Sequence, residues 1–360
     1  MTSSVLLFSA TLILTQSASA AEKFPSNFKW CVATAAHQIE GNNFHNDWWT
    51  WEKTPGRVKN NEHSGEAVDH WNRVNEDVKL MKDINVTDYR FSVEWARIEP
   101  RENEIDSAAI KHYREEVKEL LRQGIRPMVT LHHFTFPQWL REKGGWEWSQ
   151  TPAAFERFTE IVFTQIAPEA EQWVTVNEPM VNILGGYYLG LVPPSEKRSM
   201  QKIKPVFVGL LKSHVAAYQR LHALASQQKK KIRVGMAHHL RVFGPYQKWN
   251  PIDKYLARLI DQGWNWALPE SLKTGVFKFQ FPLLADIDET IPGLKNTQDF
   301  VGVNYYTGDL IHLSLFGGIK QMPREELEKT DLNWDIDPEG FRTVLKNVAL
   351  KFPGETVTIT

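Results

Sequence analysis

Hydrophobic and polar positions alternate between two patterns from Phe28 onward. Short apolar runs, typical of buried parallel strands, are followed by longer stretches with apolar residues at helical spacing. In residues 66–84, for example, Trp71, Val74 and Val78 fall on one side of a helix. The chain therefore reads as a succession of strand–helix units.

The pattern predicts seven strands and six helices. The expected strands cover residues 28–35, 87–92, 126–132, 172–176, 232–238, 300–305 and 356–360. The expected helices cover residues 66–84, 107–123, 151–165, 206–226, 252–266 and 338–351. Two helices have recognisable ends, because Pro152 lies in the first turn of one and Gly124 follows the last turn of another.

Repeated strand–helix units predict a parallel sheet with right-handed crossovers. So many units in a row favour a (β/α)8 barrel over a doubly wound sheet. The first strand is not followed by the glycine-rich loop that a dinucleotide-binding fold needs. The predicted fold class is α/β, an incomplete (β/α)8 TIM barrel that reaches its seventh strand at Thr360. We find no linker, and we expect residues 21–360 to form one domain.

The first twenty residues have the pattern of a secretory signal peptide. Val5–Leu14 is an apolar run too short to span a bilayer, and Ala18-Ser19-Ala20 has the form of a signal-peptidase site. No Lys or Arg precedes the run, and the alternative is an N-terminal core segment of a cytosolic protein. We expect residues 1–20 to be removed, leaving a secreted or periplasmic chain without a membrane span.

Composition and charge exclude several classes of protein. Lys plus Arg is 42 and Asp plus Glu is 43, so there is no global basic excess of the kind that nucleic-acid binding uses. The single cysteine rules out an intrachain disulfide and a cysteine-rich zinc module. The 14 Trp residues suit a core, and they also suit a cleft that stacks on sugar rings. We expect a small-molecule partner, no nucleic acid, and no metal or cofactor.

The active site of a (β/α)8 barrel lies at the carboxyl ends of its strands. Polar and aromatic residues follow five of the expected strands. They are His37, Gln38 and Glu40 after the first; Arg90, Glu94 and Trp95 after the second; His132, His133 and Phe134 after the third; Asn177, Glu178 and Pro179 after the fourth; and Asn304, Tyr305 and Tyr306 after the sixth. Sugar hydroxyls both donate and accept hydrogen bonds, so this mixture suits a polyhydroxylated ligand. The histidine pairs 132–133 and 238–239 do not predict a metal site, because adjacent residues on a strand face opposite sides.

Glu178 is the most distinctive of these residues. It follows an apolar strand directly, and Pro179 stops the strand there. A carboxyl at the rim of an apolar barrel is partly desolvated, which raises its pKa and suits a general acid. The alternative is a surface glutamate that opens the next helix, where the helix dipole favours an acid.

Several segments resemble glycoside hydrolase family 1, the β-glucosidase family, in the family's order. The similar segments are residues 28–41, 69–82, 89–98, 129–139, 175–179 (Thr-Val-Asn-Glu-Pro) and 299–307. The resemblance covers the chain from about residue 24 to residue 360. It implies an O-glycosyl hydrolase, a retaining β-glycosidase that hydrolyses β-linked glucosides and needs no cofactor.

The resemblance also implies roles for residues that face the sugar. Glu178 would be the catalytic acid/base, and Asn177 would hold the sugar 2-hydroxyl, a contact that strengthens in the transition state. Gln38 and His133 would bind the region of the 3- and 4-hydroxyls. Phe134 stands where the family usually has Trp, which leaves the fine specificity open.

Three further residues, Arg90, Asn304 and Tyr306, would surround the catalytic nucleophile. Arg90 would keep that group ionised and Tyr306 would donate a hydrogen bond to it. The alternative for Arg90 is a structural ion pair with Glu94. The family's nucleophile is a Glu that follows Ile-Thr or Val-Thr, and this sequence reads Ile-Thr at its last residue, Thr360.

The position of Thr360 leaves three hypotheses. The chain is an active β-glycosidase whose record or gene stops early, a non-catalytic sugar-binding relic, or an inactive fragment that does not fold stably. The nucleotide sequence after codon 360 distinguishes them, since a Glu-Asn-Gly continuation favours the first. The aglycone and the oligomeric state stay open, and the lone Cys31 is expected to be buried in the first strand.

Overall fold

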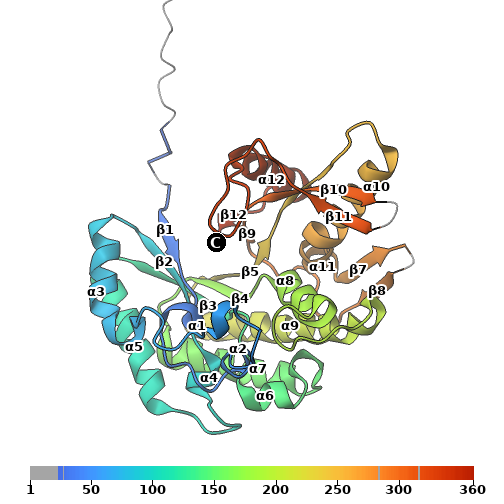
Figure 1. Ribbon diagram of the computed structural model, residues 1–360. Helices are drawn as coiled ribbons and strands as arrows, with labels where there is room; N and C mark the ends of the chain where they lie inside the picture. The colour runs from blue at the N-terminus through green and yellow to red at the C-terminus, as the bar shows by residue number, and fades with distance from the viewer. Residues whose placement is uncertain (1–22, 27, 283, 315–316) are drawn as a thin grey trace, which may run out of the picture.

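The computed structural model describes residues 23–26, 28–282, 284–314 and 317–360. The expected signal peptide, residues 1–20, lies outside them. Seven strands form one sheet in the order β1-β2-β3-β4-β5-β9-β12, and every neighbouring pair is parallel. The sheet curls into an open barrel with β1 and β12 at its edges (Figure 1). The predicted incomplete barrel is confirmed.

The barrel elements lie close to their predicted positions. The strands are β1 (Cys31–Ala33), β2 (Asp88–Ser92), β3 (Arg126–His132), β4 (Gln172–Asn177), β5 (Arg233–His239), β9 (Val301–Asn304) and β12 (Val357–Ile359). The larger helices are α3 (His70–Asp83), α5 (Ser107–Arg122), α7 (Thr151–Ile161), α9 (Lys204–Gln227), α10 (Pro251–Asp261), α11 (Ala267–Thr274) and α12 (Pro338–Lys351). α3 begins four residues later than predicted, because Ala67 and Asp69 have positive φ angles of 48° and 58°.

Short helices fill the loops that follow the barrel strands. They are α1 (Ala36–Ile39), α2 (Asp47–Glu52), α4 (Trp95–Ile98), α6 (Gln138–Glu142) and α8 (Pro179–Ile183). Three helices run on into π-helical turns: η3 (Val162–Ile166) follows α7, η4 (Leu184–Leu189) follows α8, and η6 (Gln262–Trp266) follows α10.

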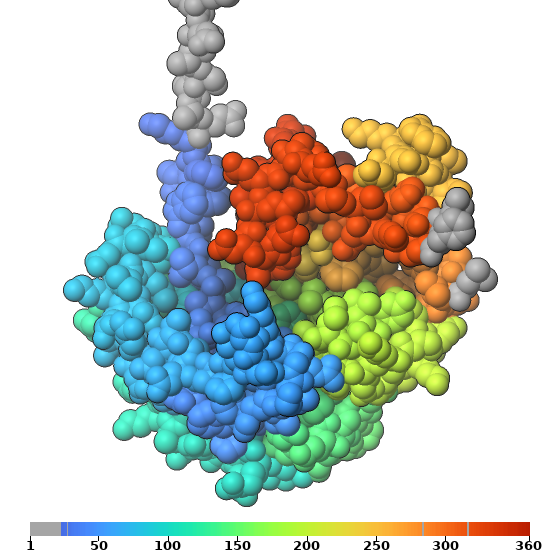
Figure 2. All heavy atoms as spheres, in the orientation of Figure 1, coloured from blue at the N-terminus to red at the C-terminus, as the bar shows by residue number. Residues whose placement is uncertain are grey.

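Two small sheets lie outside the barrel and were not predicted. β6 (Val242–Pro245), β10 (Gly308–Ser314) and β11 (Gly318–Met322) form one of them, and β7 (Val276–Phe281) and β8 (Ala285–Thr290) form an antiparallel hairpin. β6 follows β5 and β10 follows β9, so the first sheet extends from the carboxyl ends of two barrel strands (Figure 1). The surface is hollowed between the blue N-terminal segment and the red C-terminal segments (Figure 2).

The main core lies between the barrel sheet and the helices around it. Its largest fully buried side chains include Trp95, Trp146, Trp173 and Phe158. The rings of Trp95 and Phe158 stack with centroids 4.8 Å apart. Part of the aromatic excess in the sequence is therefore ordinary core.

Two further expectations concern the surface. Cys31 is exposed, so the prediction that it is buried was wrong. It lies in β1, which pairs with β2 alone and forms an edge of the sheet. Within the described ranges, no helix has both the length and the apolar character that a membrane crossing requires.

Candidate active site

Side chains from four strand ends meet on one side of the barrel. The guanidinium of Arg90, in β2, donates a hydrogen bond of 2.6 Å to Oδ1 of Asn177 at the end of β4. Nδ2 of Asn304, at the end of β9, donates to the same oxygen at 3.1 Å. Nδ2 of Asn177 lies 3.2 Å from Nε2 of His133, which follows β3. These three contacts place Asn177 at the centre of the group.

Glu178 completes this arrangement. Its side chain is buried, and its Oε1 accepts hydrogen bonds from Nδ2 of Asn304 at 2.5 Å and from the hydroxyl of Tyr306 at 3.1 Å. Its backbone has a positive φ of 44°, a left-handed conformation that costs a non-glycine residue about 1–2 kcal/mol. We call Arg90, His133, Asn177, Glu178, Asn304 and Tyr306 the Glu178 cluster.

Burial has the largest effect on the pKa of the Glu178 carboxyl. Desolvation raises its pKa, and the hydrogen bonds from Asn304 and Tyr306 and the charge of Arg90 oppose that rise without cancelling it. Burial also lowers the pKa of Arg90 to about 10, so its guanidinium stays charged at neutral pH. A carboxyl with a raised pKa beside a fixed cation can hold a proton and can also release it.

The two histidines after β3 face opposite ways. His133 contacts Asn177, whereas the ring of His132 packs against Phe136 and Trp146 with centroids 4.7 and 4.8 Å away. Burial lowers the pKa of both imidazoles, so both are neutral. Among the described residues, no three His, Cys, Asp or Glu side chains lie together so that they could hold a metal ion.

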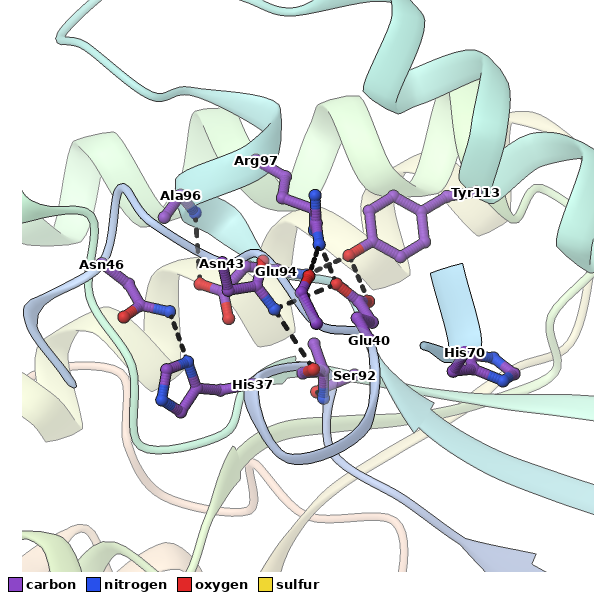
Figure 3. A network of polar contacts seen from close by, with 12 residues as sticks. His37, Glu40, Asn43, Asn46, His70, Ser92, Glu94, Ala96, Arg97 and Tyr113 are labelled. Atoms are coloured by element: carbon purple, nitrogen blue, oxygen red, sulfur yellow. Dashed lines mark hydrogen bonds and ion pairs between the residues drawn. The ribbon is translucent and has the colours of Figure 1, made fainter. Parts of the chain in front are cut away.

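Two carboxylates, Glu40 after β1 and Glu94 after β2, belong to a separate polar network (Figure 3). Glu40 pairs with Arg97 at 2.7 Å and accepts a hydrogen bond of 2.6 Å from the hydroxyl of Tyr113. Glu94 accepts from the hydroxyl of Thr135 at 3.0 Å, and burial raises its pKa to about 7. Both carboxylates are thus committed to contacts within this network.

Two expectations about Arg90 and Gln38 are not matched by contacts in the structure. The suggested ion pair of Arg90 with Glu94 is wrong, since Nε of Arg90 donates to the hydroxyl of Thr130 at 3.0 Å. Gln38 lies in α1 at the carboxyl end of β1, and its side chain is exposed. No hydrogen bond among the described residues joins that side chain to the Glu178 cluster, so its sugar-binding role stays a prediction.

His239 is a neighbour of Glu178 that the sequence did not single out. Its Nδ1 lies 3.9 Å from Oε2 of Glu178, and its ring meets the ring of Tyr306 edge-on at 5.1 Å. Neither ring nitrogen has a hydrogen-bond partner among the described residues, and burial lowers the pKa to about 3. The available signal was its place as the last residue of β5, the position that Asn177 has in β4.

The loop after β1 holds the loop after β3 in place. Nε1 of Trp48 donates to the carbonyl of Phe134 at 3.2 Å, and Oδ1 of Asp47 accepts from the backbone N–H of Phe136 at 2.9 Å. Phe134 has a positive φ of 71°, which is strained for a bulky residue. α2 therefore fixes the backbone immediately beyond His133.

Comparison with known proteins agrees with this geometry. The model of glycosyl hydrolase family 1 matches residues 20–360. The chain belongs to this family. Over 356 residues it is 29% identical to beta-glucosidase A of Thermotoga maritima, covering 94% of this chain and 78% of that protein. Over 340 residues it is 30% identical to beta-glucosidase A of Acetivibrio thermocellus, covering 89% of this chain and 75% of that protein.

Solved structures of two glycosidases have the same fold. The family 1 β-glucosidase of T. maritima superposes with a TM-score of 0.85 at 29% identity, covering 94% of this chain and 78% of that one. The β-glycosidase of Pyrococcus horikoshii superposes with a TM-score of 0.82 at 32% identity, covering 94% and 76%. The 360 residues thus match about three quarters of the length of these family 1 relatives.

In this family 1 chain, Tyr306→Phe is expected to raise the pKa of Glu178 further. The variant removes a hydrogen bond that stabilises the charged carboxylate, so the proton is held more tightly. A carbon-13 NMR titration of the glutamate carboxyl carbons measures the change, with Glu178→Gln identifying the resonance. Tyr305→Phe is the control, because the Tyr305 ring stacks on Phe341 instead. An unchanged or lower pKa in Tyr306→Phe would contradict the assignment.

Proposed function

We propose that the Glu178 cluster belongs to the active site of a retaining β-glycosidase for β-linked glucosides, with Glu178 as the acid/base. The observation that carries the proposal is a buried carboxyl of raised pKa, held by Asn304 and Tyr306 next to an amide and an imidazole. Relatives named as β-glucosidases support this substrate class.

Protonated Glu178 would donate its proton to the glycosidic oxygen as the bond to the leaving group breaks. The carboxylate that remains accepts hydrogen bonds from Asn304 and Tyr306 and lies in the field of Arg90, which stabilises its charge. In the second step the same carboxylate would take a proton from the attacking water.

Recognition of the sugar would fall to neutral groups. Asn177 would hold the 2-hydroxyl, and His133 and Gln38 would bind the 3- and 4-hydroxyls. A neutral imidazole both donates and accepts, so the lowered pKa of His133 suits a hydroxyl partner.

The retaining mechanism needs a second carboxylate about 5–5.5 Å from the acid/base. No other carboxylate of the described residues forms a hydrogen bond or an ion pair with a member of the Glu178 cluster. The hydroxyl of Thr360 donates to Oδ1 of Asn304 at 2.7 Å, so a residue joined to Thr360 would lie beside the cluster. Arg90, Asn304 and Tyr306 are the groups that would surround such a nucleophile.

The polar contacts around Asn177 and His133 also fit a second candidate, a sugar-binding protein without turnover. Binding would need only the groups proposed to contact sugar hydroxyls and no glycosyl–enzyme bond. Binding of a sugar analogue is common to both candidates, and turnover separates them.

Binding of castanospermine tests the sugar site. The solved T. maritima β-glucosidase is in complex with it. By isothermal titration calorimetry we expect measurable binding to the 360-residue chain, weakened about tenfold or more by His133→Ala, the effect of losing one good hydrogen bond.

His63→Ala is the matched control for that experiment. His63 is exposed and packs against Trp49, outside the Glu178 cluster. Absence of binding, or equal binding by His133→Ala and the wild type, would remove the support for a sugar site here.

The proposed location is outside the cytoplasm. It rests on the apolar run and the small-x-small site in residues 1–20. Mass spectrometry of the expressed protein would show a new N-terminus at residue 21, and an intact N-terminus on protein recovered from the cytoplasm would contradict it.

A further inference from the structure

A cavity lies beside the barrel, and no residue of the Glu178 cluster lines it. It has a volume of about 180 Å³. Its walls include Leu184, Tyr188, Trp264, Phe279, Phe281 and Ile319, and no described residue that lines it carries a charge. The lining residues belong to η4, η5 (Met200–Ile203), the end of α10, η6, the β7–β8 hairpin and β11.

Irregular backbone surrounds the same cavity. Leu184 and Tyr188 belong to the π-helical turn η4, and Gly263 and Trp264 belong to the π-helical turn η6. π-helical turns are rare, and they occur frequently at functional sites. Two of the three such turns in the described chain therefore line one cavity.

Aromatic rings and a buried glycine define the shape of the cavity. A methyl group added to Gly263 would meet the ring of Phe279 at 3.1 Å, so the helix and the hairpin already approach closely there. Phe279 is 3% exposed, whereas Ile319 at the rim is 42% exposed. The cavity thus has a closed inner end and an opening beside β11.

Both π-helical turns connect to the neighbourhood of Glu178. η4 continues the helix α8, which begins directly after Glu178. Nε1 of Trp264 donates to the carbonyl of His239 at 2.9 Å, and the two rings meet edge-on at 5.8 Å. His239 in turn lies 3.9 Å from the Glu178 carboxyl. A ligand in the cavity would contact Trp264, which packs against His239, the neighbour of the acid/base.

We propose that this cavity binds a small uncharged aromatic molecule the size of a phenyl ring. An apolar cavity of about 150 Å³, lined by leucine, isoleucine and phenylalanine, stays dry and takes up benzene. The present cavity is slightly larger, and it adds the flat ring of Trp264 to its walls. A charged ligand is excluded, since its ion would be desolvated without a partner.

A fluorine NMR titration with fluorobenzene tests the proposal on the full chain. We expect saturable binding with a Kd of about 1 mM or tighter, a weak but measurable affinity for so small a ligand. Ile319→Trp should block the opening and Leu184→Phe should fill the interior. Each variant should weaken binding at least about tenfold, as loss of most of the apolar contact requires.

Ile252→Trp is the matched control for the rim variant, because Ile252 is 50% exposed on α10 and does not line the cavity. It should bind fluorobenzene as the wild type does, and circular dichroism checks that all variants are folded. Absence of saturable binding would overturn the proposal. So would equal binding by both filling variants and the wild type, or displacement of fluorobenzene by glucose, which would place the probe in the sugar site.

Discussion

A polypeptide of residues 21–360 is expected to show no appreciable turnover of 4-nitrophenyl β-glucoside. Glu178 can protonate a leaving group, but the two carboxylates that follow β1 and β2, Glu40 and Glu94, are committed to Arg97, Tyr113 and Thr135. Removing one essential group from a catalytic unit costs about 10⁴–10⁶ in kcat. Release of 4-nitrophenol, followed by absorbance, measures the result.

Extending the same polypeptide should produce activity. The extension adds the family's Glu-Asn-Gly segment and an eighth strand–helix unit after Thr360. Introducing Glu178→Gln should then abolish hydrolysis of substrates with poor leaving groups, such as alkyl glucosides, which need the acid most. Robust hydrolysis by residues 21–360 alone would mean that another carboxylate serves as the nucleophile.

The barrel could be predicted because its strands carry a local signal. Residues 126–132 were predicted to be a strand and form β3 with the same limits. The strands of a parallel sheet are buried on both faces, so they are short, continuous apolar runs that the sequence shows directly. The three-stranded sheet of β6, β10 and β11 was not predicted, because the pairing of β6 with β10 has no local signal. β6 and β10 are brought together by the barrel rather than by a hairpin, so their pairing depends on residues far apart in the chain.

The start of α3 shows a different limit of sequence patterns. Its helical spacing begins at Ala67, yet Ala67 and Asp69 adopt left-handed backbone conformations that neither residue favours locally. The segment after β1 contacts the chain at this helix start: the backbone N–H of Asn42 donates to the carbonyl of Gly65, and that of Trp71 donates to the carbonyl of Glu40. Such tertiary effects leave no trace in the hydrophobic pattern.

The candidate site was predicted only in part. The grouping of Asn177, Glu178, Asn304 and Tyr306 could be predicted from strand ends and family motifs, because parallel strands end at one face of a barrel. The hydrogen-bond partners of these residues could not be predicted. Tyr306 and Asn304 donate to Glu178 itself in this structure, and the proximity of His239 depends on the last residue of β5 pointing inward.

The contribution of His70 to the free energy of unfolding is expected to fall as the pH becomes alkaline. Its Nδ1 lies 2.6 Å from Asp77, its Nε2 lies 3.3 Å from Glu116, and it thereby joins α3 to α5. Burial alone lowers the pKa of His70, but the hydrogen bonds and charges of Glu116 and Asp77 outweigh burial and raise the pKa to about 9. The folded protein therefore holds this proton more tightly than the unfolded chain, whose histidine has a pKa of about 6.5.

The sign of the pH effect follows from that difference. Below about pH 6.5 the imidazolium is present in both states and contributes its full stabilisation, about 3 kcal/mol, which is lost as the pH rises through 9. Urea unfolding of the wild type and of His70→Gln measures the contribution as a difference, which removes the other titrating groups. The difference should be large at pH 6 and small at pH 10. His63→Gln, which replaces an exposed histidine, should follow the wild type at both pH values. A difference between wild type and His70→Gln that stays constant from pH 6 to pH 10 would show that the imidazolium does not hold α3 against α5.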